Sequence, residues 1–170
     1  MSGPSCIDRD LVRSAADIIR VFQEAERSLV TAESCTAGLI AAVLSHAEGA
    51  ASVLQGGFVA YSKDHKARAL GVDRDLLARD GSVNAAVAEQ MAKGALARSP
   101  ADIAIAVTGV LGPEPDEDGN PVGLVFLAGL SRAGARRILK PDYGKGDADR
   151  LRRAVVLDAL ALALSLAPPQ

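Results

Sequence analysis

The amino-acid sequence predicts an α/β fold, a single three-layer α/β/α sandwich around a mixed, mostly parallel sheet. Two observations support this prediction. Buried-strand patterns alternate with amphipathic helix patterns early in the chain, and two strand patterns joined by a Gly-containing turn follow late. Alternation is typical of parallel strands with helices on both faces, whereas a hairpin adds antiparallel strands. The 170 residues fit one domain over residues 1–170, with a loose N-terminus over residues 1–7.

The first predicted elements are a helix, a buried strand and a second helix. Residues 8–26 carry apolar side chains at helical spacing, with charges between them. Residues 28–32 are a short apolar run typical of a buried strand. The Ala- and Leu-rich residues 36–44 predict a helix that follows this strand directly.

A second strand is predicted over residues 53–61, where Gly56 and Gly57 indicate a bulge or a close approach of the backbone. A short helix is expected to follow through Leu70. Asn84 is suited to cap a further helix that runs to about residue 98. Three more strands and a closing helix complete the prediction: residues 102–107, 122–130 and 135–140 for the strands, and residues 147–166 for the helix.

Composition and charge exclude several classes of protein. Hydrophobic residues make up 49% of the chain and Trp is absent, so Ala, Leu and Val must build the core of a globular domain. A net charge of −2 argues against a nucleic-acid-binding protein, although one or two phosphates on a small ligand remain compatible with it. No apolar segment approaches the ~18 residues of a membrane span, so no membrane partner is expected.

Cysteine usage and the start of the chain favour a reducing compartment. Two cysteines, Cys6 and Cys35, make neither a disulfide framework nor a metal-ligand cluster. The first residues lack a basic stretch followed by an apolar run, so we expect a soluble cytoplasmic protein. HExxH and CxxC motifs and clustered carboxylates are absent from the sequence, and neither a metal nor a cofactor is expected.

Polar residues follow three of the predicted strands, at residues 33–36, 61–66 and 108–109. Ligands of open α/β sheets bind at the carboxyl ends of the strands, where loops and helix N-termini project together. Ser34 is placed for nucleophilic attack there, and Lys66 is a base if burial or nearby positive charge lowers its pKa. The N–H groups of Cys35 and Thr36 are candidates for holding an oxyanion.

Two other interpretations of these residues stay open. In the first, Ser34 and Thr36 only cap the helix and Lys66 is a solvated surface charge. In the second, Cys35 is the nucleophile and is paired with His65 or His46.

Four linked motifs carry a family resemblance. They are TAESCTAG at residues 31–38, GGFVAYSKDHKARALGV at 56–72, AVTGVLGP at 106–113 and NPVGLVFLA at 120–128. Together they resemble the C-terminal domain of the competence/damage-inducible protein CinA, the family of stand-alone nicotinamide-nucleotide amidases. The resemblance covers nearly the whole chain, and it implies a three-layer α/β/α fold.

The resemblance also implies an activity. This activity is the metal-free deamidation of nicotinamide mononucleotide to nicotinic acid mononucleotide and ammonia, a step of pyridine-nucleotide salvage. By position, Ser34 is the nucleophile, Lys66 the general base and Thr108 an aid to proton transfer or oxyanion stabilisation. The resemblance assigns eight further residues to substrate binding: Glu33, Cys35, Thr36, Gly38, Tyr61, Gly109, Gly112 and Arg152.

Several positions depart from the family pattern and bear on the substrate. Ala37 stands in the ESCTGG motif, residues 49–51 are Gly-Ala-Ala, and Ala148 replaces the arginine of a late GDR motif. The family's glycine-rich loop is replaced by GPEPDEDGNP at residues 112–121. Its acids at residues 116–118 would repel a phosphate if they faced the site; alternatively they point to solvent.

These departures leave two other functions open. One is a Ser–Lys amidase of another small amide, and the other is a catalytically weak nucleotide-binding or regulatory module. The expected partner is a small nucleotide, and self-association into a homo-oligomer is left open.

Overall fold

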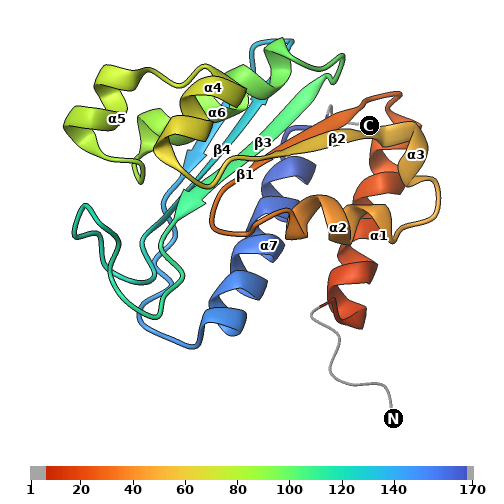
Figure 1. The fold of residues 1–170 in the computed structure, drawn as a ribbon. Coiled ribbons are helices and arrows are strands. Elements are labelled where there is room, and N and C mark those ends of the chain that lie inside the picture. Colours follow the sequence, from red (N-terminus) through yellow and green to blue (C-terminus); the bar gives the residue numbers. More distant parts are fainter. Residues whose placement is uncertain (1–6, 168–170) are drawn as a thin grey trace.

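A five-stranded sheet lies between two layers of helices (Figure 1). The computed structural model describes residues 7–167. The strand order is β2-β1-β3-β4-β5, with β1 paired in parallel to both β2 and β3, and with β4 antiparallel to both β3 and β5. The strand bounds are Leu29–Glu33 (β1), Leu54–Val59 (β2), Ile103–Gly109 (β3), Val125–Ser131 (β4) and Arg136–Leu139 (β5). Since only β4 runs opposite to the other strands, the predicted mixed, mostly parallel sheet is confirmed.

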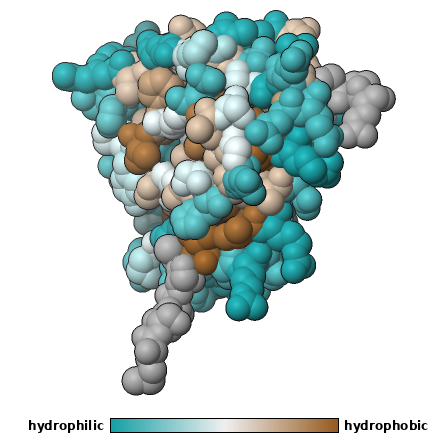
Figure 2. Space-filling view, turned by 90° about the vertical axis from the view of Figure 1, so that its right-hand side faces the viewer, coloured by the Kyte–Doolittle hydropathy of each residue, from teal (hydrophilic) through white to brown (hydrophobic). Residues whose placement is uncertain are grey.

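One face of the sheet is covered by α1 (Arg9–Glu24), α2 (Leu39–Ser45), α3 (Ala50–Val53) and α7 (Ala148–Leu164). Large side chains of the strands, such as Leu29 and Ile105, point into this layer and pack against Phe22 of α1 and Val155 of α7. The side of the molecule where α2 and α3 lie is mostly hydrophilic, with small apolar patches (Figure 2). Helix α1 is amphipathic, as its sequence periodicity predicts, with Leu11, Ile18 and Phe22 among its buried residues.

The other face is covered by α4 (Lys63–Leu70), α5 (Arg74–Asp80) and α6 (Ala85–Ala97). Here the strands present small side chains, among them Ala32, Ala104 and Ala106. Small side chains let α6 lie close against β1, β3 and β4. Asn84 accepts a hydrogen bond from the N–H of Val87 and caps α6, as predicted.

The edge strand β2 contains the irregularity that its glycines indicate. The register with β1 shifts between Leu29 and Val30, which leaves Gln55 as the extra residue of a bulge. A Cβ atom at Gly57 would lie 2.5 Å from Thr31 Oγ1. The backbone of β2 therefore approaches β1 too closely for any side chain at that position.

The structure differs from the sequence prediction in three places. The helix predicted from residue 36 begins only at Leu39, because Ala37 (φ 52°) and Gly38 (φ 95°) adopt left-handed conformations. Helices α3 and α5 were not predicted. The loose N-terminus predicted for residues 1–7 lies outside the described residues except for Ile7, which packs against the core. Within residues 7–167, no helix is long and apolar enough to cross a membrane.

Candidate active site

A pocket of about 440 Å³ opens at the carboxyl ends of β1, β2 and β3. The turn after β1, helix α4, the loop after β3 and helix α7 each contribute to its wall. Seven of the residues proposed from the sequence line this pocket: Ser34, Cys35, Tyr61, Lys66, Gly109, Gly112 and Arg152. Parallel strands bring their carboxyl ends to one edge of a sheet, and this explains why segments distant in sequence meet here.

Ser34 lies directly after β1 in a tight turn. Its N–H donates to the carbonyl oxygen of Val107 at 3.1 Å, and only 5% of the residue is exposed. Within the described part of the chain, the Ser34 hydroxyl and the N–H groups of Cys35 and Thr36 form no hydrogen bond to another residue. A buried hydroxyl beside unused N–H donors is the arrangement that nucleophilic attack and oxyanion binding require.

Glu33 has a role that the sequence did not suggest. Its carboxylate is buried and does not line the pocket, although the residue was assigned to substrate binding. It accepts five hydrogen bonds of 2.6–3.1 Å, from the Thr31 and Thr36 hydroxyls and from the N–H groups of Gly38, Ile40 and Ala41. The carboxylate thereby occupies the N-terminus of α2 and holds the turn that carries Ser34.

Lys66 extends from α4 into the pocket. It is only 1% exposed, which contradicts the interpretation of a solvated surface charge. Burial lowers its pKa from about 10.5 to about 8, an effect that the nearby Asp116 and Asp118 carboxylates oppose and the Lys63 ammonium reinforces. Within the described residues, the Lys66 amine forms no hydrogen bond or ion pair. A much larger fraction of its amine is therefore neutral near pH 7 than for an ordinary lysine, and this neutral form is able to accept a proton.

The thiol interpretation is not supported by the environment of Cys35. Burial raises the pKa of the Cys35 thiol to about 12, so the reactive thiolate is scarce at neutral pH. His46 and His65 are both exposed, and neither lines the pocket. The His46 ring contacts the carbonyl oxygen of Ala42 on its own helix.

Thr108 lies beneath the pocket rather than in its wall. It is fully buried at the end of β3, and its hydroxyl donates to the carbonyl oxygen of Ser82 at 2.7 Å. Ser82 lines the pocket, as does its neighbour Val83. Thr108 therefore holds the segment before α6 in place, and its part in proton transfer stays a prediction.

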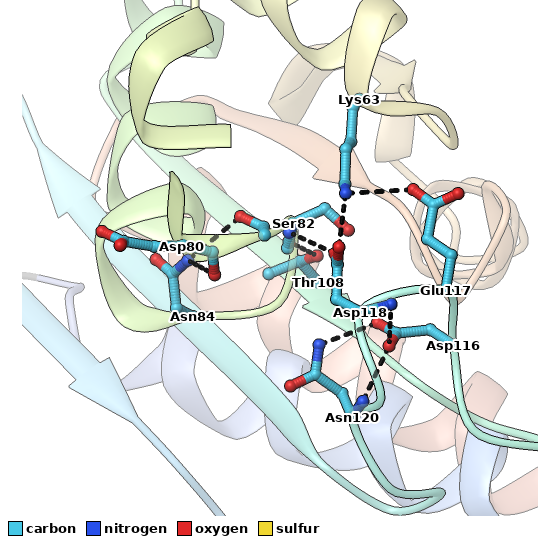
Figure 3. Close-up of polar contacts among 10 residues, drawn as sticks. Lys63, Asp80, Ser82, Asn84, Thr108, Asp116, Glu117, Asp118 and Asn120 are labelled. Atoms are coloured by element: carbon cyan, nitrogen blue, oxygen red, sulfur yellow. Dashed lines mark hydrogen bonds and ion pairs between the residues drawn. The ribbon is translucent and has the colours of Figure 1, made fainter. Parts of the chain in front are cut away.

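The acidic loop at residues 112–121 contributes to the pocket wall and contacts the start of α4 through its acids (Figure 3). Lys63 at the start of α4 contacts Asp118 at 2.6 Å and Glu117 at 3.1 Å. Asp118 also accepts a hydrogen bond from the N–H of Ser82 at 3.3 Å. Glu114, Asp116 and Glu117 line the pocket, so the interpretation in which the acids only point to solvent is wrong.

The residues predicted from the sequence and the residues that line the pocket differ in part. Glu33, Thr36, Gly38 and Thr108 lie outside the pocket wall. Lys63, which lies in the predicted segment 61–66 but was given no role, and Ser82, which was not predicted, both contribute to the wall. The signal for Lys63 was its position one helical turn before Lys66, on the same face of α4. Ser82 carries no such signal, because it is held in place by the hydroxyl of Thr108, which is 26 residues later in the sequence.

Comparison with known proteins places the chain in a family. A model of the CinA C-terminal domain matches residues 12–167. The chain belongs to the CinA C-terminal domain family. A CinA-family crystal structure, competence/damage inducible protein CihA from Agrobacterium tumefaciens, has a TM-score of 0.91 and 39% identity, covering 99% of this chain and 100% of that one. The family resemblance and the fold predicted from the sequence are thereby confirmed.

CinA relatives differ in length and in the names they carry. A CinA-like protein of Geobacter metallireducens is 41% identical over 143 residues, which are 84% of this chain. The chain spans about a third of the length of that relative (34%). Nicotinamide-nucleotide amidohydrolase PncC of Escherichia coli K12 is 33% identical over 90% of this chain and 92% of its own length. Across residues 7–167 of this CinA domain, no group of three or more His, Cys, Asp or Glu side chains is placed to hold a metal ion.

Proposed function

We propose that this protein is an amidohydrolase that deamidates nicotinamide mononucleotide to nicotinic acid mononucleotide and ammonia, in cytoplasmic pyridine-nucleotide salvage. The observation that carries the proposal is the buried Lys66, whose pKa is lowered to about 8, in the same pocket as the buried Ser34 hydroxyl. The similarity to the amidohydrolase PncC along almost its whole length supports the substrate.

The proposed reaction proceeds through an acyl-enzyme. Ser34 Oγ attacks the carboxamide carbon while the neutral Lys66 amine takes the hydroxyl proton. The N–H groups of Cys35 and Thr36 stabilise the oxyanion of the tetrahedral intermediate. The intermediate collapses as Lys66 returns the proton to the leaving nitrogen, which departs as ammonia. Water, deprotonated by Lys66, then hydrolyses the ester to release the carboxylate and restore Ser34.

The Ser34 hydroxyl and the Lys66 amine are not hydrogen-bonded in the structure. Hydrogen bonds of a catalytic pair are often long without substrate and tighten in the substrate complex. Arg152 of α7 is the proposed phosphate ligand, since it lines the pocket and since, among residues 7–167, it pairs only with the largely exposed Asp149. Tyr61, 72% exposed at the rim, is placed to contact the substrate as it enters.

The decisive test is ammonia release from nicotinamide mononucleotide by the wild type and by Ser34→Ala. We expect the variant to lose activity by at least about 10³-fold, with a free energy of unfolding within about 1 kcal/mol of the wild type. Cys35→Ala is the matched control and should stay active. If Cys35→Ala is inactive and Ser34→Ala is active, the nucleophile is the Cys35 thiol and not the Ser34 hydroxyl.

A panel of other small amides completes this test. Faster ammonia release from another amide would assign a different substrate to the same Ser–Lys chemistry. Binding of the nucleotide without ammonia release from any amide would identify a binding or regulatory module.

A further inference from the structure

The pocket contains an anionic group, Asp116, that forms no ion pair within the described residues. Asp116 Oδ1 accepts hydrogen bonds from the N–H groups of Asp118 and Asn120, and Asp116 Oδ2 accepts from the Asn120 amide at 2.9 Å. All of these donors are uncharged, so they hold the carboxylate in place without placing a cation against it. Glu114, beside it in the wall, forms no hydrogen bond or ion pair within residues 7–167.

The other acids of the loop are balanced by a lysine. Lys63 forms ion pairs with both Glu117 and Asp118 (Figure 3). Asp116 and Glu114 are therefore the acidic groups left to act on a ligand. A cluster of acids alone does not make a binding site, but this one shares its pocket with Ser34 and Lys66. Both residues are more than nine-tenths buried, and their side chains form no hydrogen bond within the described residues.

Asp116 also acts at the reacting end of the pocket. Its carboxylate is close enough to Lys66 to favour the charged ammonium, against the larger effect of burial. A ligand group that binds between Asp116 and Lys66 therefore lies next to the negative charge of the Asp116 carboxylate. If that group is itself positive, it neutralises Asp116 and favours the neutral amine of Lys66.

The substrate named under the proposed function, on which this inference rests, has such a group. The ring of nicotinamide mononucleotide is a pyridinium cation that bears the carboxamide, and its phosphate is an anion. We propose that Asp116, assisted by Glu114, selects amides carried on a cationic ring by facing the pyridinium, while Arg152, which α7 contributes to the same pocket, binds the phosphate. The repulsion of phosphate expected from the acidic loop is then avoided, because the acids face the ring end of the ligand.

Two ligands separate ring charge from shape. One is nicotinamide mononucleotide, and the other is the benzamide C-nucleotide, in which a carbon atom replaces the ring nitrogen and the planar ring is neutral. Their dissociation constants are measured by calorimetry on the full chain carrying Ser34→Ala, so that no ligand is consumed. The ratio of the two constants reports the charge selectivity alone.

We expect Asp116→Asn to reduce the preference for the cationic ring about tenfold, the effect of one partly screened charge pair, and Glu114→Gln to reduce it less. Asparagine keeps an acceptor for the N–H groups of residues 118 and 120, so the loop should fold, and thermal unfolding checks this. Glu48→Gln, the same charge change at an exposed residue outside the pocket, is the matched control and should leave the ratio unchanged.

An unchanged ratio in Asp116→Asn, or equal losses for both ligands, would overturn the inference. Ammonia release by the wild type with such an unchanged ratio would leave the proposed function standing. Cation-selective binding without ammonia release would overturn the function but not the inference. Failure of both ligands to bind would overturn both.

Discussion

Lys66 controls the pH dependence expected of catalysis. Because its pKa is about 8, the fraction of neutral amine rises as the pH rises toward that value. We therefore expect kcat/KM to increase about tenfold per pH unit below the pKa and to level off above it. Lys66→Arg should be nearly inactive at every pH, since a guanidinium stays protonated. A flat wild-type profile, or an active arginine variant, would show that residue 66 supplies only positive charge.

Glu33 is expected to act as a positioning residue. In Glu33→Gln the side-chain NH₂ must face hydroxyl and N–H donors that now point at a carboxylate oxygen, which leaves buried donors unsatisfied. We expect a loss of about 2 kcal/mol in the free energy of unfolding. Since Glu33 holds the turn of Ser34 but lies outside the pocket, kcat should fall about tenfold or more with little change in KM.

Chemical denaturation and steady-state kinetics measure the two effects of Glu33→Gln. The exposed Glu26→Gln is the control and should change neither quantity. A Glu33→Gln variant with a higher KM and unchanged kcat would instead support the substrate contact predicted from the sequence.

At the scale of single residues, the sequence indicated Ser34 and Lys66 because nucleophile and base are recognisable by type and by place after a strand. It did not indicate how Glu33 and Thr108 are used. Both are polar residues in a motif, and only the fold shows that one caps α2 and the other holds Ser82. Burial decides between such roles, and burial depends on which elements pack above the residue.

The contact between α4 and α6 is tight enough to make a helical glycine irreplaceable. A Cβ atom at Gly94 of α6 would lie 1.9 Å from the carbonyl oxygen of Leu70, the last residue of α4. In an open helix, Gly→Ala would stabilise by about 1 kcal/mol. Here the overlap forces the helices apart, and we expect Gly94→Ala to lower the free energy of unfolding by about 2 kcal/mol.

Gly94→Ala should also disturb the active site, because the displaced helix α4 carries Lys66. We expect kcat/KM of Gly94→Ala to fall even under conditions where the protein is fully folded. Lys93→Ala, which removes an exposed ion pair with Glu89 on the same helix, should change stability by less than about 0.5 kcal/mol. Wild-type stability in Gly94→Ala would show that the helices separate without cost.

At the scale of elements, long periodic segments were predictable and short ones were not. The 16-residue α1 has five buried apolar residues at helical spacing, and its sequence pattern is clear. Helix α5 has only seven residues, with Leu76 and Leu77 as its buried pair, so a helical repeat cannot be distinguished from a turn. The late start of α2 was missed because it depends on the Glu33 carboxylate capping N–H groups from five to eight residues later.

In the whole molecule, the layering followed from alternation along the strands. In β1, Leu29 packs in the layer of α1 and α7, whereas Val30 and Ala32 pack in the layer of α6. The pocket was predicted only as a place, the carboxyl edge of the sheet. The contact of the acidic loop with Lys63 is a property of the assembled molecule, since the rest of α4, helices α5 and α6, and strand β3 lie between residues 63 and 118 in the sequence.

The burial of Lys66 lowers the free energy of unfolding of the whole protein. A lysine whose pKa falls from about 10.5 to about 8 destabilises the folded state at neutral pH, because the unfolded chain solvates the charge better. Lys66→Met keeps the volume and removes the charge. We therefore expect Lys66→Met to raise the free energy of unfolding at pH 7 by about 2 kcal/mol, and the melting temperature by several degrees, while activity is lost.

The pH dependence of this gain separates the charge from packing. Below pH 8 both folded and unfolded wild-type chains hold the Lys66 proton, and the cost is fully present. Between about pH 8 and 10.5 the folded chain releases the proton while the unfolded chain keeps it, so wild-type stability rises relative to the variant. Unfolding free energies of both proteins at pH 7 and pH 10 should therefore differ less at pH 10. A gap that stays constant over this range would mean that methionine only packs better, and that Lys66 is not the lowered-pKa base on which catalysis depends.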